Sequence, residues 1–194
     1  ETLGDERVET VRLCHGDDDR GFSPCTYGTV NAEAWLSQLK SLMDAAPRDV
    51  VTLLVENYVQ PDHLKSVFEN AAMYDQIFVH SMNTEWPTLG ELIAQDKPLV
   101  VFWEQGEDLS HPWIHDFLTH SWTTNFAEQN TEDMNCDSLR GDPEQAVYHM
   151  NNWLSGPLGL SDPSRGDEAN DLDFLIERAS ECWIQHGKRP TFIA

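Results

Sequence analysis

Apolar stretches of strand length alternate with stretches of helical periodicity along the chain. The continuous apolar runs within residues 49–58 and 98–104 are typical of parallel strands that are covered on both faces. Residues 32–46 and 61–72 carry apolar side chains three and four positions apart, which predicts amphipathic helices. The other predicted strands are residues 8–16, 76–80, 122–126, 145–153 and 189–194, and the other predicted helices are residues 112–120, 170–186 and a segment that begins at Thr88.

This alternation predicts an α/β fold with a parallel sheet. Both ends of the chain lie close to predicted strands, so that sheet edges would be left bare. A complete eight-stranded barrel needs about 250 residues, and the chain has 194. We therefore expect residues 1–194 to form a single domain, an incomplete (β/α)8 TIM-type barrel that lacks its first two strands and the end of its last strand.

Polar side chains follow the apolar residues of several predicted strands. His15 ends the first of these strands, Glu56 and Asn57 end the strand of residues 49–58, and Glu104 ends the strand of residues 98–104. The carboxyl ends of parallel strands meet at one edge of a sheet, and ligands bind at that edge. We expect His15 and Glu56 to lie there together. The alternative for His15 is a structural histidine that hydrogen-bonds a neighbouring loop.

The second half of the chain adds three candidates. Arg140, next to Gly141, can hold a phosphate oxygen through its guanidinium group, or it can pair with the acidic run that precedes it. His149 and Trp153 lie at the end of a predicted strand, where an aromatic wall suits a sugar or inositol ring. Core packing is the alternative for Trp153.

Three further histidines, His111, His115 and His120, are spaced four and five residues apart. The glutamate of the H-E-x-x-H zinc motif is absent, so we interpret them as surface or packing histidines. The chain also lacks the G-x-S-x-G, Walker and G-x-G-x-x-G motifs, which removes the serine hydrolase and nucleotide-binding functions that rest on them.

The chain is strongly acidic, with 34 Asp and Glu against 12 Lys and Arg and a net charge of −22. This balance argues against nucleic acid as a partner, because nucleic acid binding draws on clustered lysine and arginine. It should also repel anionic membranes at long range, although a few local cations can still bind one phosphate. No run of eighteen apolar residues occurs, so no membrane span is predicted.

The four cysteines permit three disulfide pairings. We expect Cys14 to pair with Cys25, because the two bracket the loop after the first strand, and Cys136 to pair with Cys182. Two disulfides would indicate an oxidising compartment. The alternative is four unpaired thiols in a cytosolic protein, and a zinc site is disfavoured because no C-x-x-C pair occurs.

Five segments of the chain occur in the order and spacing seen in phosphatidylinositol-specific phospholipase C X-domain-like proteins. They are residues 13–16 (Leu-Cys-His-Gly), 50–59, 86–89, 99–102 and 187–194. The chain most resembles the secreted branch of that family, the PLC-like phosphodiesterases, which carry a cysteine beside this histidine.

The resemblance implies a distorted (β/α)8 barrel that cleaves an inositol phospholipid or a related phosphodiester. In this family one histidine takes a proton from the attacking inositol hydroxyl and a second histidine protonates the leaving alcohol. His15 matches the second, so its implied role is general acid, for which an imidazole is suited by its near-neutral pKa. Asn57, Glu104, Arg140, His149 and Trp153 would then contact the substrate.

The resemblance also raises calcium as a cofactor. Glu56 matches a calcium ligand of the calcium-dependent members, and Glu1 would be a second ligand. Calcium requires several hard oxygen ligands. The alternative is a site that does not rely on a metal, as in many secreted relatives.

We expect a secreted or extracellular monomer that acts on a phospholipid or a soluble phosphodiester, with peripheral membrane contact as one option. The alternative function is a catalytically inactive barrel that serves as a binding or surface module. A glycerophosphodiester-type enzyme is disfavoured, because the sequence offers no acid-rich metal cluster.

The first catalytic histidine of the family belongs to a Thr-His-Asn/Asp-Ser type motif that is absent from residues 1–194, as is the arginine expected in the next strand. We therefore predict that the isolated 194-residue chain hydrolyses a phosphodiester no faster than its His15→Ala variant. Product release from phosphatidylinositol vesicles measures both rates, and a faster wild type would contradict the prediction.

Overall fold

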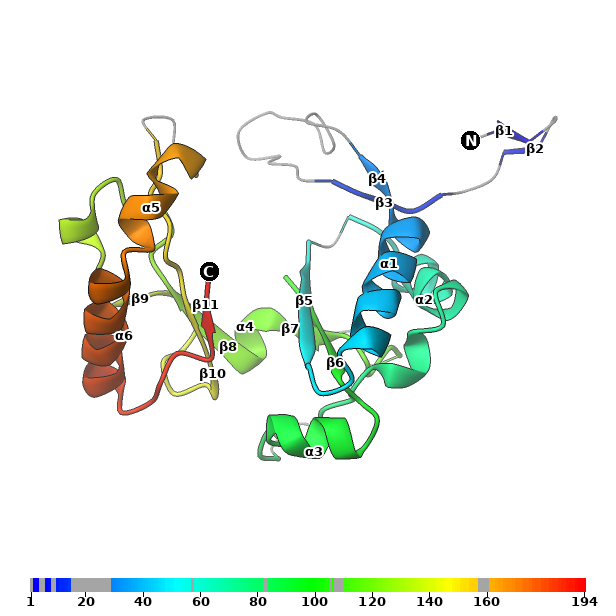
Figure 1. Ribbon diagram of the computed structural model, residues 1–194. Helices are drawn as coiled ribbons and strands as arrows, with labels where there is room; N and C mark the ends of the chain where they lie inside the picture. Colours follow the sequence, from blue (N-terminus) through cyan, green and yellow to red (C-terminus); the bar gives the residue numbers. More distant parts are fainter. Residues whose placement is uncertain are drawn as a thin grey trace. The chain divides into compact units, whose positions relative to one another are not determined.

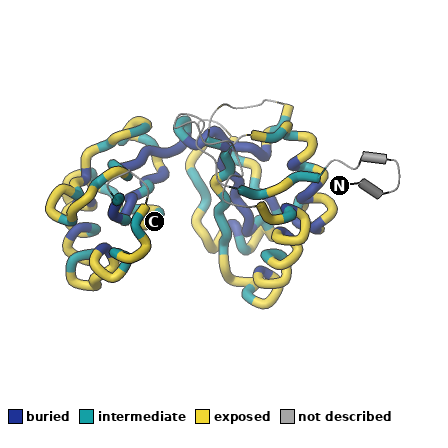
Figure 2. The backbone as a smooth tube through the Cα atoms, turned by 90° about the horizontal axis from the view of Figure 1, so that it is seen from above, coloured by how far each residue is buried: buried dark blue, intermediate teal, exposed yellow. Residues whose placement is uncertain are grey.

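A computed structural model describes residues 2–3, 6–7, 10–14, 29–56, 58–81, 84–104, 106, 110–156 and 161–194 (Figure 1). The chain forms two compact units. The first unit comprises Glu1–Trp103 and Glu107–Ile114, and the second comprises Glu104–Gly106 and His115–Ala194. Figure 2 colours the backbone by burial: residues 99–103 and 121–124 are buried throughout, whereas the helices carry both buried and exposed residues.

The first unit is built around the parallel strands β5 and β6. Its elements in chain order are β1 (Thr2–Leu3), β2 (Glu6–Arg7), β3 (Arg12–Leu13), β4 (Val30–Asn31), α1 (Ala32–Ala45), β5 (Val51–Val55), α2 (Pro61–Asn70), η2 (Tyr74–Gln76), α3 (Leu89–Ala94) and β6 (Leu99–Trp103). Strand β5 pairs with β6 from Val51 opposite Leu99 to Val55 opposite Trp103. Apolar side chains of α1 and α2, among them Leu36 and Phe68, pack with β6 in the core of this unit.

The helices of the first unit begin where their local sequence satisfies the free backbone N–H groups. Asn31 accepts a hydrogen bond from the Ala34 N–H at 2.8 Å and so caps α1. Thr88 and Glu91 form a capping box at the start of α3, and these hydrogen bonds lower the pKa of Glu91. Pro61 occupies the first turn of α2, where its missing N–H is not needed.

The second unit contains a four-stranded sheet in the order β11, β10, β8, β9. Its elements are β7 (His115–Asp116), α4 (Phe117–His120), β8 (Ser121–Thr124), η3 (Thr131–Asp133), β9 (Ser138–Arg140), β10 (Val147–Met150), η4 (Pro163–Arg165), α5 (Gly166–Ala169), α6 (Leu172–His186) and β11 (Phe192–Ile193). Strand β10 runs parallel to β8 and β11, and β9 runs antiparallel to β8.

One face of this sheet packs against α6. Trp122 of β8 stacks on Tyr148 of β10, with ring centroids 3.8 Å apart. These two rings and Met150 form a buried cluster with Cys182, and Leu175 and Ala179 pack against it. Burial raises the pKa of Tyr148 to about 12, so its phenol stays protonated at neutral pH.

Two further contacts hold α6 in this unit. Cys136 and Cys182 form a disulfide, which is the pairing that the sequence predicts. Arg178 is 3% exposed, and its guanidinium donates to the Asn151 carbonyl and the Asn152 side-chain oxygen at 2.9 Å, and to the Asn135 carbonyl at 3.3 Å. The loop that leads to β9 is therefore tied to α6 covalently and by hydrogen bonding.

The sequence prediction of an α/β class is confirmed, but the prediction of an incomplete (β/α)8 TIM-type barrel is wrong. The described strands form four separate sheets, three of which have only two or three strands. None of these sheets closes on itself, and β9 runs antiparallel to its neighbour. A barrel requires one continuous ladder of tilted strands, and the described strands are two to five residues long.

No helix in the described part of the chain is both long and apolar enough to cross a membrane.

We predict that Arg178→Met lowers the free energy of unfolding by about 2–4 kcal/mol, because three oxygen acceptors in a buried region lose their donor. Urea unfolding followed by tryptophan fluorescence measures this loss. The control is Arg48→Met at an exposed position, for which we expect a change within about 0.5 kcal/mol. Equal losses in the two variants would contradict the assigned role of Arg178.

Candidate functional site

Four side chains form a row across the four-stranded sheet of the second unit. Strand register places Arg140 opposite Thr123, Thr123 opposite His149, and His149 opposite Phe192. Side chains directly opposite each other on neighbouring strands share one face of a sheet. We call these four residues the transverse row. Because successive side chains of a strand alternate between faces, the row lies on the face opposite to Trp122 and Tyr148, which pack against α6.

Arg140 forms an ion pair with Glu104. Its Nη2 donates to Glu104 Oε1 at 3.1 Å, and the two side chains are 30% and 29% exposed. The sequence offered the acidic run before Arg140 as a possible partner, but the structure pairs Arg140 with the glutamate that follows β6. Two of the predicted substrate-contacting residues are therefore brought together.

Thr123 and His149, the two inner members of the row, each carry a buried polar atom that has no hydrogen-bond partner among the described residues. Thr123 is 4% exposed, and its Oγ1 makes no hydrogen bond. The Nε2 atom of His149 is likewise buried without a partner. Buried polar groups are rarely left unsatisfied, so both atoms call for a partner such as a solvent molecule or a ligand group.

The environment of His149 favours the neutral form of its imidazole. Burial is the main cause that lowers the pKa of His149, and the positive charge of Arg140 lowers that pKa further. The ring is flanked edge-on by Phe117 at 6.0 Å and by Phe192 at 6.3 Å between ring centroids. A neutral imidazole has one N–H donor and one acceptor nitrogen.

The row combines three kinds of hydrogen-bond donor that suit an oxyanion. A guanidinium, a hydroxyl and a neutral imidazole are all able to donate hydrogen bonds to phosphate oxygens. Only the guanidinium is charged, and Glu104 balances that charge. Thr123 and Phe192 were missed as site residues, because their position beside His149 depends on strand register, which the sequence does not display.

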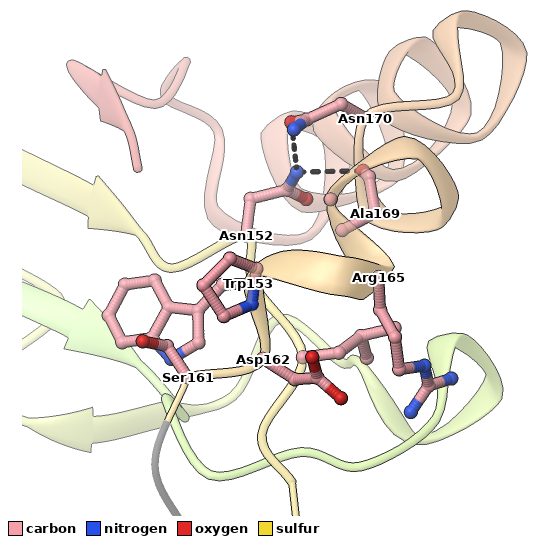
Figure 3. A pocket seen from close by; sticks show the side chains of 10 residues that line it. Asn152, Trp153, Ser161, Asp162, Arg165, Ala169 and Asn170 are labelled. Carbon is pink, nitrogen blue, oxygen red and sulfur yellow. Dashed lines mark hydrogen bonds between the residues drawn. The ribbon is translucent and has the colours of Figure 1, made fainter.

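Trp153 lies in a different part of the second unit. It lines a pocket of about 200 Å³ that also involves Asn152, Asp162 and Arg165. Figure 3 shows the Asn152 side chain pointing to Asn170 and Ala169, to which its Nδ2 donates at 3.4 and 2.8 Å.

Several predicted site residues lie outside the described residues, namely His15, Asn57, Glu1 and Cys25. Cys14 is disulfide-bonded. Glu56 directly follows β5 in the first unit and is half-buried. The structure therefore leaves the expected meeting of His15 and Glu56 as a prediction.

The described residues do not supply a metal site. No group of three or more His, Cys, Asp or Glu in this part of the chain is arranged to hold a metal ion. For calcium, Glu56 is the single predicted ligand that is described, and calcium requires several oxygen ligands. Of the three spaced histidines, His111 hydrogen-bonds Asp62 at 2.8 Å, and His115 and His120 contact each other edge-on.

A protein-family model described as PI-PLC X 1 matches residues 5–194. The chain belongs to the PI-PLC X family. This match extends over both units and includes the Leu-Cys-His-Gly segment that carries His15.

Two curated fungal proteins are similar to this member of the PI-PLC X family. "PI-PLC X domain-containing protein 1" of Arthroderma benhamiae is 29% identical over 169 residues, which cover 78% of this chain and 55% of that protein. An "Uncharacterized secreted protein" of the same organism is 27% identical over 165 residues, which cover 78% of this chain and 36% of that protein. The chain thus spans about half and about a third of their lengths. No solved structure matches it significantly.

The lowered pKa of His149 predicts a pH dependence of stability. Below the ordinary histidine pKa of 6.5, the unfolded chain binds a proton at this position and the folded chain does not, so the free energy of unfolding falls. The fall ends once the pH passes below the folded pKa. His149→Gln should therefore lose less stability than wild type between pH 7.5 and pH 5.5, as measured by urea unfolding.

The control for this measurement is Leu139→Gln, an exposed position of β9 beside Arg140, which introduces no titratable group. It should keep the wild-type loss of stability over the same pH range. An unchanged pH dependence in His149→Gln would show that His149 does not contribute.

Proposed function

We propose that the natural protein that carries these residues is a phosphodiesterase of the phospholipase C type, which acts on an inositol phospholipid or a related phosphodiester, and that this chain supplies its phosphate-binding groups and its general acid. The observation that carries this proposal is the transverse row, in which Arg140, Thr123 and His149 offer hydrogen-bond donors on one sheet face. In a chain with a net charge of −22, a guanidinium beside two buried polar atoms without partners favours an anionic ligand group. Family membership supports a phosphate ester as that group.

In this proposal His15 is the general acid. It matches the family histidine that protonates the leaving alcohol, within the Leu-Cys-His-Gly segment. An imidazolium can give up its proton near neutral pH, so histidine suits this step. The role of His149 differs, because burial favours its neutral form and so favours hydrogen bonding over proton delivery.

An extracellular location belongs to the same proposal. A similar protein is named as secreted, and the disulfide between Cys136 and Cys182 is consistent with an oxidising compartment. A phospholipid or a soluble phosphodiester as substrate, peripheral membrane contact and a monomeric state are further parts of the proposal.

We expect His15→Ala to lower the rate of phosphodiester hydrolysis by about 10²- to 10⁴-fold, because general acid catalysis contributes on this scale. The assay uses the natural protein that carries these 194 residues, with phosphatidylinositol vesicles and glycerophosphoinositol as substrates. The control is His63→Ala on the exposed side of α2, which should keep the wild-type rate.

A full rate in His15→Ala would contradict the role of His15. Failure of the wild type to hydrolyse either diester would favour the alternative function, an inactive binding module.

A further inference from the structure

The positive charge of Arg140 is already balanced inside the second unit. The guanidinium has five N–H donors, and its contact with Glu104 uses one of them. Both side chains are about one third exposed, so a small ligand can reach the pair from solvent. A ligand at Arg140 therefore meets a guanidinium whose carboxylate partner stays close by.

No second cation in the transverse row offsets the charge of Glu104. Thr123 and Phe192 are uncharged, and His149 is held in its neutral form. Asp116 adds a further carboxylate to this unit: its Oδ2 accepts from the Gly106 N–H at 2.5 Å, two residues after Glu104. Asp116 also directly precedes Phe117, whose ring contacts His149. Among the described residues, Glu104 is the acidic partner of Arg140, and the transverse row holds no second cation to offset it.

We propose that Glu104 is a specificity-determining residue that makes the transverse row favour monoanionic phosphodiesters over dianionic phosphomonoesters. A diester carries one negative charge, which the exposed donors of Arg140 can accept while Glu104 remains in place. A monoester carries nearly two charges at neutral pH, and the second charge is repelled by the carboxylate. This inference rests on the proposed function, because that function names a phosphate ester as the ligand. It goes further by identifying Glu104 as the residue that selects diesters.

The second unit contains a matched control pair. Arg165 and Glu168 form an ion pair with an N–O distance of 2.6 Å, and their side chains are 30% and 43% exposed. This pair lies at η4 and α5, outside the transverse row. Removing the carboxylate of Glu168 changes the net charge by the same amount as removing that of Glu104.

The test measures binding rather than catalysis. The full chain is titrated with dimethyl phosphate, a monoanion, and with methyl phosphate at pH 8, where it is a dianion, at constant ionic strength. The imidazole resonances of His149 and the guanidinium resonances of Arg140 report binding by NMR.

We expect the wild type to bind dimethyl phosphate about three- to tenfold more tightly than methyl phosphate, the scale of one charge interaction at a partly exposed site. Glu104→Gln should tighten methyl phosphate binding about tenfold and so remove the preference. Glu168→Gln should keep the wild-type preference, and Arg140→Gln should lose both ligands.

Three outcomes would overturn the proposal: an unchanged preference in Glu104→Gln, an equal change in Glu168→Gln, or no binding of either ester by a folded wild type. The His15→Ala assay is independent of these outcomes. If hydrolysis depends on His15 but Glu104→Gln leaves the ligand preference unchanged, only the specificity role of Glu104 is refuted. If the protein binds the diester selectively but hydrolyses neither substrate, only the proposed function is refuted.

Discussion

The packing of β8 and β10 against α6 is the constraint on which the candidate site depends. Trp122 and Tyr148 stack and occupy the α6 face, and their neighbours Thr123 and His149 must therefore occupy the other face. The disulfide between Cys136 and Cys182 and the hydrogen bonds of Arg178 hold α6 in this place. A one-residue slip of β10 would send His149 into the apolar cluster, so the packing of one face determines the chemistry of the other.

The sequence predicts those parts of the fold that depend on local patterns. The apolar runs at β5 and β6, the helix caps at Asn31 and Thr88, and the pairing of Cys136 with Cys182 all follow from residues that are close in sequence or distinctive in type. The barrel prediction failed because closure depends on pairing between distant strands. Periodicity shows that a strand exists, but it does not show which strand lies beside it.

The same limit applies to the candidate site. His149 and Glu104 could be named from their positions near the ends of predicted strands, and Arg140 from its guanidinium, but the pairing of Arg140 with Glu104 spans 36 residues. Thr123 was not identified at all, because a threonine in a strand is common and only the register with Arg140 and His149 makes it part of a row. Residue type supplied the candidates, and long-range pairing supplied their arrangement.

Burial and charge act together on this row. Burial disfavours a charged imidazole at position 149, and the nearby guanidinium disfavours it further, so Arg140 is the single cation of the row. The Arg140 guanidinium and the Glu104 carboxylate together carry almost no net charge, and their partial exposure limits the strength of the ion pair. Such a site does not hold anions by bulk positive charge. It can bind an anion only where hydrogen-bond geometry and a small ligand charge compensate for the acidity of the rest of the chain.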